Sequence, residues 1–329
     1  MKAVCIEGAG DAGRLVLADV PSPRPQAGEV LLDVVAAGVN RADTSQRRGR
    51  YGPPPDASPY PGLECSGTVA ALGPGVEGWR VGDRVCALLA GGGYAEQVCV
   101  PAGQLMAAPS AIDLVSAAAL PEVAATVWSN LVGLGGLGAG DTVLVHGGGS
   151  GIGTMAIQVA RLVGARVVVT AGSARKLEAC AALGADVLVD YRLESFVERT
   201  LEATGGRGVD VVLDIVGAEY ARANVEVLAP GGRLVVIGIQ SGAEATFDLR
   251  EVLRRRAVVT GSMLRSRSLE DKAAIVADVV RHVLPAVQDG RVRPVVDRVL
   301  PLAEAAQAHA LVESSDHVGK ILLMTRRRD

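Results

Sequence analysis

The stretch DTVLVHGGGSGIGTMAIQVARLV, residues Asp141–Val163, decides the fold. It begins with an unbroken apolar run, Val143–Val145, which is typical of a strand buried on both faces of a parallel sheet. A turn dense in glycine follows at residues 147–153, and from Thr154 small and apolar residues recur at helical spacing. The stretch therefore predicts strand, glycine turn and helix, an arrangement that suits a pyrophosphate because glycine lets the backbone approach and the helix start offers N–H groups.

The residues after this helix bear on which dinucleotide would bind. A second apolar run, Arg166–Thr170, ends where a dinucleotide site places the residue that contacts the ribose, and an NAD site would have Asp or Glu there. This chain continues instead with Ser173, Arg175 and Lys176. A hydroxyl and two cations suit a 2′-phosphate, which favours NADP(H) over NAD(H). Alternatively, the cations form the exposed first turn of a helix that Ser173 caps, which explains the pattern as well.

Composition excludes several classes of protein. The chain has 329 residues, a length sufficient for two globular domains, and its residues are 49% hydrophobic and 21% charged. Aromatic residues are only 3% and the net charge is −3, which argues against binding to nucleic acid. The apolar run at the N-terminus is too short for a signal peptide, and we expect no membrane span and a cytoplasmic location. The five scattered cysteines suggest free thiols.

The first 120 residues are rich in β signals and predict a compact β-rich domain. Between two strands lies a polar insertion, residues 40–61, with a short helix at Ala42–Arg48 and then Tyr51 before a glycine and three prolines. This insertion is either a lid over a site or a packed surface crossing. Strands are expected at residues 2–6, 15–19, 30–36, 67–72, 84–87 and 94–100.

The second part of the chain alternates strands with helices. A helix at Ser116–Leu134 leads into it, and six such strands predict a doubly wound parallel sheet with its ligand at their carboxyl ends. The tail, with strands near 294–300 and 320–324, is expected to rejoin the first domain. The six strands are expected at residues 142–146, 166–170, 186–190, 209–216, 233–239 and 257–263, with helices at 176–183, 196–203 and 221–228.

This organisation resembles the medium-chain dehydrogenase/reductase superfamily. Within it, the segments AGVNRAD at 37–43, PGLECSG at 61–67 and VGDRV at 81–85 are similar to the quinone oxidoreductase family. Tyr51 with its prolines, Ser150, and the segments at 170–173 and 264–267 look most like the tumour-suppressor-inducible branch. The resemblance implies an α/β fold in which a six-stranded Rossmann sheet over 121–265 joins a β-rich GroES-like substrate domain over 1–120 and 266–329.

The same resemblance implies that no metal takes part. Zinc alcohol dehydrogenases of the superfamily have a cysteine where this chain has Asn40 and a histidine where it has Leu63, and their closely spaced four-cysteine lobe is missing. Neither an amide nor an aliphatic side chain is a usable ligand in a Cys/His zinc site. Without a Lewis acid, alcohol oxidation loses its main electrostatic support, whereas hydride transfer from NADPH to an electrophilic acceptor stays feasible.

By resemblance, NADPH binds in the cleft between the domains and passes reducing equivalents to a quinone or another electrophilic small molecule. Asn40, near the nicotinamide ribose, and Tyr51, facing the acceptor, are the implied catalytic residues. The implied cofactor-binding residues are Asn40, Thr126, Ser150, Gly151, Ile152, Gly153, Ser173, Lys176, Tyr191, Gly238, Leu264, Arg265 and Lys320.

Other interpretations stay open. Asn40 would also serve as the cap of the helix after it, Tyr51 as a packing residue, and His146 as a buried structural group. The rival activities are reduction of an enone or alkenal double bond, with Tyr51 as proton donor, and a non-catalytic NADPH-binding sensor. We also expect a homodimer through the apolar edge strand Ala257–Met263.

Overall fold

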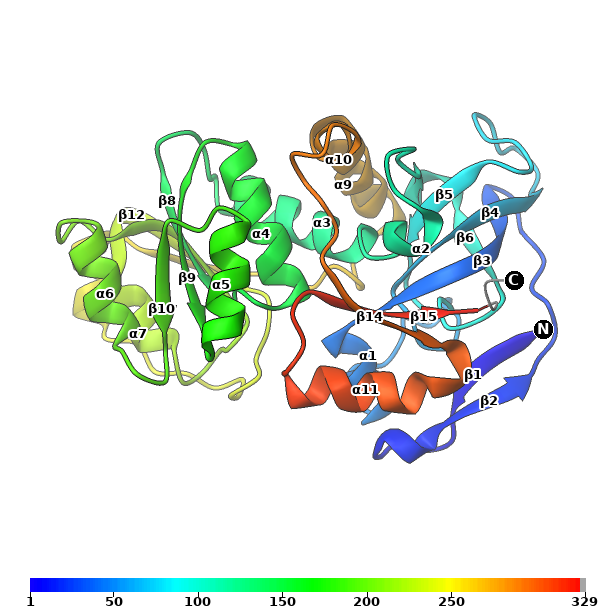
Figure 1. Cartoon of the computed structure of the whole chain (residues 1–329), viewed down its shortest axis with the longest axis horizontal. Helices are drawn as coiled ribbons and strands as arrows, with labels where there is room; N and C mark the ends of the chain where they lie inside the picture. Colours follow the sequence, from blue (N-terminus) through cyan, green and yellow to red (C-terminus); the bar gives the residue numbers. More distant parts are fainter. Residues whose placement is uncertain (326–329) are drawn as a thin grey trace. The chain divides into compact units, whose positions relative to one another are not determined.

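The structure is a computed structural model that describes residues 1–325. The chain forms two compact units, one of residues 1–125 with the chain from Leu264 onward and the other of Thr126–Met263. The first unit is therefore interrupted in sequence by the second. The blue and red ends of the chain both belong to the first unit, and the green and yellow middle forms the second (Figure 1).

The second unit is built on a six-stranded parallel sheet in the order β10-β9-β8-β11-β12-β13. The predicted doubly wound sheet is confirmed, and the order reverses between β8 and β11, where folds of this kind bind their ligands. Val143, Leu144 and Val145 are fully buried, because helices cover the sheet. The strands are β8 (Thr142–His146), β9 (Arg166–Ala171), β10 (Val187–Asp190), β11 (Val209–Asp214), β12 (Leu228–Val236) and β13 (Val258–Gly261).

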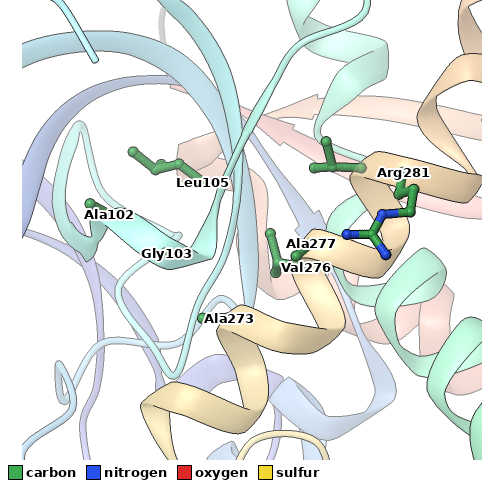
Figure 2. A pocket seen from close by; sticks show the side chains of 8 residues that line it. Ala102, Gly103, Leu105, Ala273, Val276, Ala277 and Arg281 are labelled. Carbon is green, nitrogen blue, oxygen red and sulfur yellow. The ribbon is translucent and has the colours of Figure 1, made fainter. Parts of the chain in front are cut away.

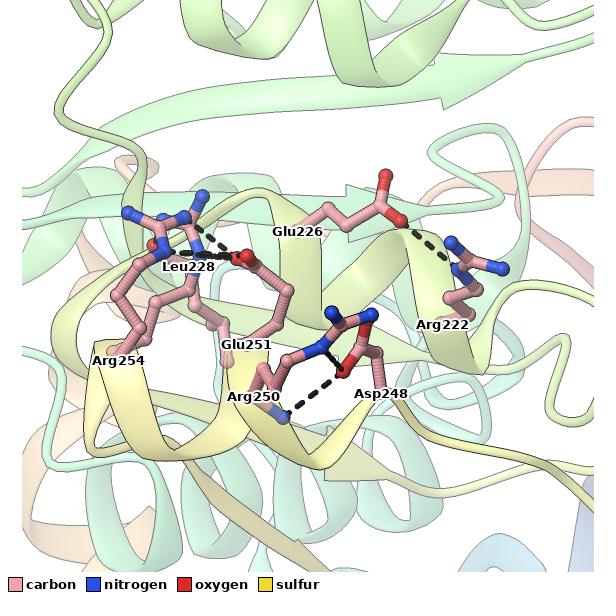
Figure 3. Close-up of polar contacts among 8 residues, drawn as sticks. Arg222, Glu226, Leu228, Asp248, Arg250, Glu251 and Arg254 are labelled. Atoms are coloured by element: carbon pink, nitrogen blue, oxygen red, sulfur yellow. Dashed lines mark hydrogen bonds and ion pairs between the residues drawn. The ribbon is translucent and has the colours of Figure 1, made fainter.

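Helices link these strands, and one of them was not predicted. They are α4 (Gly151–Leu162), α5 (Ala174–Ala182), α6 (Phe196–Ala203), α7 (Ala221–Glu226) and α8 (Leu249–Arg255). The sequence analysis missed α8, although Leu249, Val252 and Leu253 recur in it at helical spacing. Polar contacts hold α8: Asp248 caps its first turn, and Glu251 pairs with Arg254 at 2.6 Å (Figure 3). The buried Arg255 also donates to the Leu228 carbonyl.

The first unit contains two sheets. A pair, β1 (Lys2–Ile6) and β2 (Leu15–Asp19), is antiparallel, and a larger sheet runs in the order β14-β15-β3-β4-β5-β7, with β6 also paired to β3. The predicted return of the tail is confirmed, because β15 pairs antiparallel with β3. These strands are β3 (Glu29–Val39), β4 (Glu64–Leu72), β5 (Arg84–Leu88), β6 (Gln97–Pro101), β7 (Leu105–Ala107), β14 (Val296–Pro301) and β15 (Lys320–Met324).

Helices of three to fourteen residues complete this unit. The core of the larger sheet packs against α11, whose buried residues include Ala305, Ala308 and Val312. The helices are η1 (Ala12–Arg14), α1 (Arg41–Arg47), η2 (Ala102–Gln104), α2 (Leu114–Ala117), α9 (Leu269–His282), α10 (Leu284–Gln288), η4 (Leu302–Glu304) and α11 (Ala305–Ser314).

The helix predicted at Ser116–Leu134 is divided. It comprises α2, then α3 (Pro121–Val127) and the π-helical η3 (Trp128–Leu134), because Pro121 starts a new helix. Contrary to the sequence-based expectation, Leu114–Leu134 is long and apolar enough to match a membrane span, with a mean hydropathy of 1.2. However, 72% of that stretch is buried inside the protein, as in the core helix of a globular domain, so the match is weak evidence for a membrane.

Candidate functional site

The glycine turn lies between β8 and α4, where the sequence placed it. Ser150 is the N-cap of α4, and its Oγ accepts a hydrogen bond from the Gly153 amide at 3.0 Å. A Cβ on Gly153 would lie 2.6 Å from Gly148 Cα, so only glycine lets the helix approach the turn this closely. Ser150, Gly151, Ile152 and Gly153 therefore form a helix start that offers backbone N–H groups to an anion.

Three residues predicted to contact a 2′-phosphate gather at the ends of β9 and β10. A Cβ on Gly149 would lie 2.9 Å from Lys176 Cγ, so the stem of Lys176 packs on the glycine turn. Similarly, a Cβ on Gly172 would lie 2.6 Å from the Tyr191 hydroxyl. Ser173 begins α5 but makes no side-chain capping bond there, so the simple cap does not account for this serine.

His146, at the end of β8, is a satisfied buried group. Its Nε2 lies 2.7 Å from Asn224 Oδ1 and its Nδ1 lies 3.0 Å from Thr170 Oγ1, so the neutral ring donates to the amide oxygen and accepts from the hydroxyl. Burial lowers the pKa of His146 to about 4. Phe196 and Tyr220 pack edge-on against the ring. The structure thus supports a structural role under the turn, where a charged acid or base is unfavourable.

Three further predicted residues contact the protein in specific ways. Thr126 is buried, and its carbonyl accepts from the Asn130 amide at 2.8 Å. A Cβ on Gly238 would lie 2.7 Å from the Ile215 carbonyl, so the chain after β12 passes close to the end of β11. Leu264 is also buried. These contacts leave their backbone roles toward a cofactor as predictions.

Arg265 fastens the insertion that carries Tyr51. Its guanidinium donates to the carbonyls of Ala90 at 2.7 Å and Tyr51 at 3.0 Å, and to Gln46 Oε1 at 2.8 Å. It also lies 5.3 Å from the centre of the Tyr51 ring, within cation–π distance. Only the backbone of Arg265 is therefore available for the role toward a carboxamide that the resemblance implies.

A buried ion pair holds Asn40. Lys320 Nζ lies 2.7 Å from Glu64 Oε1 and donates to Asn40 Oδ1 at 2.6 Å and to the Val39 carbonyl at 3.1 Å. The Asn40 amide in turn donates to Glu64 Oε1 at 3.0 Å. Glu64 is fully buried, and this pairing compensates for the loss of its hydration. The Asn40 side chain is therefore directed at two charges, and Asn40 is at the same time the N-cap residue of α1.

This arrangement changes the role of Lys320. The sequence analysis made it a candidate for the cofactor's phosphates, but its three ammonium donors are directed at Glu64, Asn40 and Val39. No donor is left for a phosphate in this geometry, so we assign Lys320 to holding Asn40. Glu64 is the counterion that makes this possible.

Asp43 supports Asn40 from the backbone side. Its Oδ2 accepts from the Asn40 amide N–H at 2.8 Å and its Oδ1 from Gly62 N–H at 3.1 Å. Burial raises the pKa of Asp43 to about 6, although these two N–H groups and Lys320 act in the opposite direction. Sequence reasoning missed Asp43, yet its place three residues after Asn40 at a helix start is the signal of half a capping box.

Tyr51 lies near one acidic and one basic side chain, which act on its hydroxyl in opposite directions. Burial and the charge of Glu122 raise the pKa of its hydroxyl, while Arg265 lowers it. Glu122 itself is partly buried in the first turn of α3, and burial together with Glu64 raises its pKa to about 8. Its backbone N–H donates to Glu64 Oε2 at 2.9 Å. Glu122 was not predicted, and no local motif marks it.

A separate pocket of about 420 Å³ lies between η2 and α9, lined mostly by alanine and valine side chains with Arg281 at one side (Figure 2). None of the predicted site residues lines it. Among residues 1–325, no group of three or more His, Cys, Asp or Glu side chains is arranged to hold a metal ion. Leu63 is buried beside Glu64, where the zinc enzymes have their histidine.

Comparison with known proteins now identifies the family. Residues 26–110 match the model of the alcohol dehydrogenase GroES-like domain, and residues 151–279 match that of zinc-binding dehydrogenases. The chain is 32% identical to quinone oxidoreductase of Rattus norvegicus, over 93% of this chain and 92% of that protein. It is 33% identical to a phenolphthiocerol/phthiocerol polyketide synthase of Mycobacterium tuberculosis over 97% of this chain, but spans only 14% of that protein.

Solved structures agree with this fold. The chain is similar to an NAD-dependent alcohol dehydrogenase, with a TM-score of 0.88 and 35% identity over 99% of this chain and 100% of that one. It is also similar to mycobacterial Rv1454c solved with NADPH, with a TM-score of 0.87 and 32% identity over the same shares. The predicted nearness to one branch stays a prediction. The chain belongs to the quinone oxidoreductase family of the medium-chain dehydrogenase/reductase superfamily, with a GroES-like and a Rossmann domain.

Proposed function

We propose that the chain is an NADPH-dependent quinone oxidoreductase that works without zinc. When bound, NADPH supplies the reducing equivalents, and the acceptor is a quinone held beside Tyr51. The single observation that carries the cofactor choice is Lys176, whose stem packs on Gly149 of the pyrophosphate turn. We infer that its ammonium group pairs with the 2′-phosphate when NADPH is bound.

The residues at this end of the sheet fit the cofactor. Ser173 and Tyr191 supply hydroxyls on either side of Gly172, and the chain from Thr170 to Lys176 has no carboxylate that would repel a 2′-phosphate. The relatives differ in this respect, since one similar structure is called NAD-dependent and another was solved with NADPH. We give more weight to residues 170–176, which include two cations and no carboxylate.

The chemistry around Asn40 supports an acceptor that needs no Lewis acid. An amide stands where a zinc ligand would be, and the buried ammonium of Lys320 lies 2.6 Å from its oxygen. The positive charge of Lys320 at that place would repel a metal ion, which is also positively charged. A quinone is already electrophilic, so the contribution of the protein is orientation, with Asn40 fixed toward the nicotinamide ribose and Tyr51 toward the acceptor.

The activity test compares two acceptors. NADPH oxidation is measured with an ortho-quinone and with an enone, in wild type and in Tyr51→Phe, with Tyr60→Phe as the control tyrosine. We expect the quinone to be the better acceptor and Tyr51→Phe to retain its turnover within about tenfold, because quinone oxygens take protons from water. Enone reduction would instead need a donor to carbon, and losing it typically costs about 10²-fold or more.

Two other results would replace the proposal. A better rate with the enone that collapses in Tyr51→Phe would make the chain a double-bond reductase. Tight NADPH binding without oxidation by either acceptor would make it a sensor.

We also propose a homodimer formed through β13. This strand is the last in the parallel sheet, and its Val258 and Val259 are 43% and 42% exposed, with Met263 just beyond it at 62%. An apolar edge strand leaves unpaired backbone groups and apolar side chains in water. Pairing with the same strand of a second copy would satisfy both.

A further inference from the structure

A chain of buried side chains runs from Arg47 to Asp43 within the first unit. Arg47 Nη1 lies 3.3 Å from His309 Nδ1, His309 Nε2 lies 3.2 Å from the Tyr94 hydroxyl, and that hydroxyl lies 3.1 Å from Asp43 Oδ2. Arg47, Tyr94, Asp43 and His309 are each at most 1% exposed. The residues come from α1, the loop before β6 and α11, so the contacts are long-range.

The donors and acceptors in this chain of hydrogen bonds allow only one direction of donation. A guanidinium can only donate, so His309 Nδ1 must accept and the ring proton must be on Nε2. Nε2–H then donates to the Tyr94 oxygen, and the tyrosine proton goes to the Asp43 carboxylate. Burial, followed by the charge of Arg47, lowers the pKa of His309 to about 3, which agrees with a neutral ring.

Both ends of this chain of hydrogen bonds are anchored. Arg47 pairs with Glu313 at 2.6 Å, and its Nε donates to the Gly10 carbonyl at 3.1 Å. At the other end, the Asp43 oxygen that accepts from Tyr94 also accepts from the Asn40 N–H at 2.8 Å. The hydroxyl of Tyr94 therefore fixes the carboxylate that fixes the backbone of Asn40.

We propose that Tyr94 and His309 are positioning residues for the reaction, which hold Asp43 as a carboxylate and through it aim the Asn40 side chain. This inference rests on the proposed function, in which Asn40 serves the nicotinamide end of the cofactor. Neither residue touches substrate or cofactor, so each acts only through Asp43. Small displacements of a group that orients the reactants can cost about 10²-fold in rate.

The charge on Asp43 depends on several groups. Lys320 and the Tyr94 hydroxyl favour the carboxylate, as do the N–H groups of Asn40 and Gly62, and burial opposes it. Farther charged groups that interact with Asp43 are Glu122, Arg265 and Tyr51. Removing the Tyr94 hydroxyl takes away one stabilising hydrogen bond, so the pKa of Asp43 should rise.

The first experiment compares Tyr94→Phe with Tyr60→Phe, a tyrosine of the same unit outside this chain of contacts. For each variant, NADPH binding is measured directly, and kcat and KM are measured from pH 5 to 8 with the acceptor that wild type reduces best. We expect kcat of Tyr94→Phe to fall about 10- to 100-fold at pH 6 and its acid limb to move to higher pH, with NADPH affinity changed less than threefold. Coincident pH profiles for wild type and Tyr94→Phe would overturn the proposal.

A second measurement needs no variant to fold. In ¹⁵N-histidine-labelled wild type, the His309 ring should be neutral with its proton on Nε2 down to pH 5. A proton on Nδ1, or a charged ring at pH 6, would overturn the directed chain. If wild type reduces no acceptor, the proposed function fails. The ¹⁵N chemical shifts of His309 still decide whether the chain of hydrogen bonds exists.

Discussion

Single glycines decide how closely the charged groups of the site can approach. A Cβ on Gly38 would overlap Glu64 Oε1 and lie 2.6 Å from Glu64 Cδ. Glu64 is fully buried and pairs with Lys320, so it has no room to withdraw without breaking that pair. The missing side chain at residue 38 is therefore a requirement of the ion pair next to Asn40.

Gly38→Ala should destabilise the protein by about 3–5 kcal/mol, because it breaks a buried ion pair. The free energy of unfolding is measured by urea denaturation, together with the rate of NADPH oxidation, which should fall in parallel. Gly52→Ala is the control, since a Cβ on Gly52 meets nothing within 4 Å. Equal stability of the two variants would mean that Glu64 moves freely.

At the residue scale, local motifs point to the residues around the glycine turn but not to the buried contacts near Asn40. Ser150, Gly153, Ser173 and Lys176 are contiguous with one turn and its next strand, so local motifs suffice to find them. Tyr94 and His309 are 215 residues apart, and no local pattern links them. The partners of His309 are brought to it only by the tertiary fold.

At the scale of elements, the end of β8 carries a buried histidine whose protonation makes the stability of the fold depend on pH. The pKa of His146 is lowered to about 4 from an ordinary value of 6.5. Between these two values the unfolded chain binds a proton that the folded protein does not. The contribution of this residue to the free energy of unfolding is therefore complete above pH 6.5 and is lost as the pH falls toward 4.

The comparison of wild type with His146→Leu makes this testable. The difference between their free energies of unfolding should shrink by about 2 kcal/mol from pH 7 to pH 5, because only wild type carries this proton linkage. His282→Leu, at an exposed position of α9, is the control for the loss of a histidine as such. A difference that stays constant between the two pH values would mean that His146 titrates in the folded protein as it does in the unfolded chain.

Elements with a strong apolar period were predicted well, and those held by polar contacts were not. The strands β8 and β15 were predicted at their exact bounds, because continuous apolar runs identify buried strands. The helix α8 was missed; two of its three apolar side chains are exposed, and ion pairs such as Glu251 with Arg254 support it (Figure 3). The helix predicted at 116–134 divides at Pro121, which the apolar period alone does not show.

At the scale of the whole molecule, the proposed dimer makes an independent prediction. Wild type should have twice the mass of one chain in light scattering at micromolar concentration. Val259→Asp should give the mass of a single chain, because it places a charge on the apolar edge strand. Val299→Asp is the matched control, since Val299 is also 42% exposed and lies on β14, at the edge of the other sheet. A single-chain mass for wild type would remove the dimer.

The most direct test of the account is the choice between NADPH and NADH. Initial rates of oxidation of both cofactors by an ortho-quinone are compared in wild type, in Lys176→Ala and in Arg161→Ala, which removes a cation far from the glycine turn at the end of α4. We expect kcat/KM for NADPH to fall about 10- to 100-fold in Lys176→Ala alone, while kcat/KM for NADH is unchanged. Equal use of both cofactors by wild type, or an unchanged preference in Lys176→Ala, would contradict it.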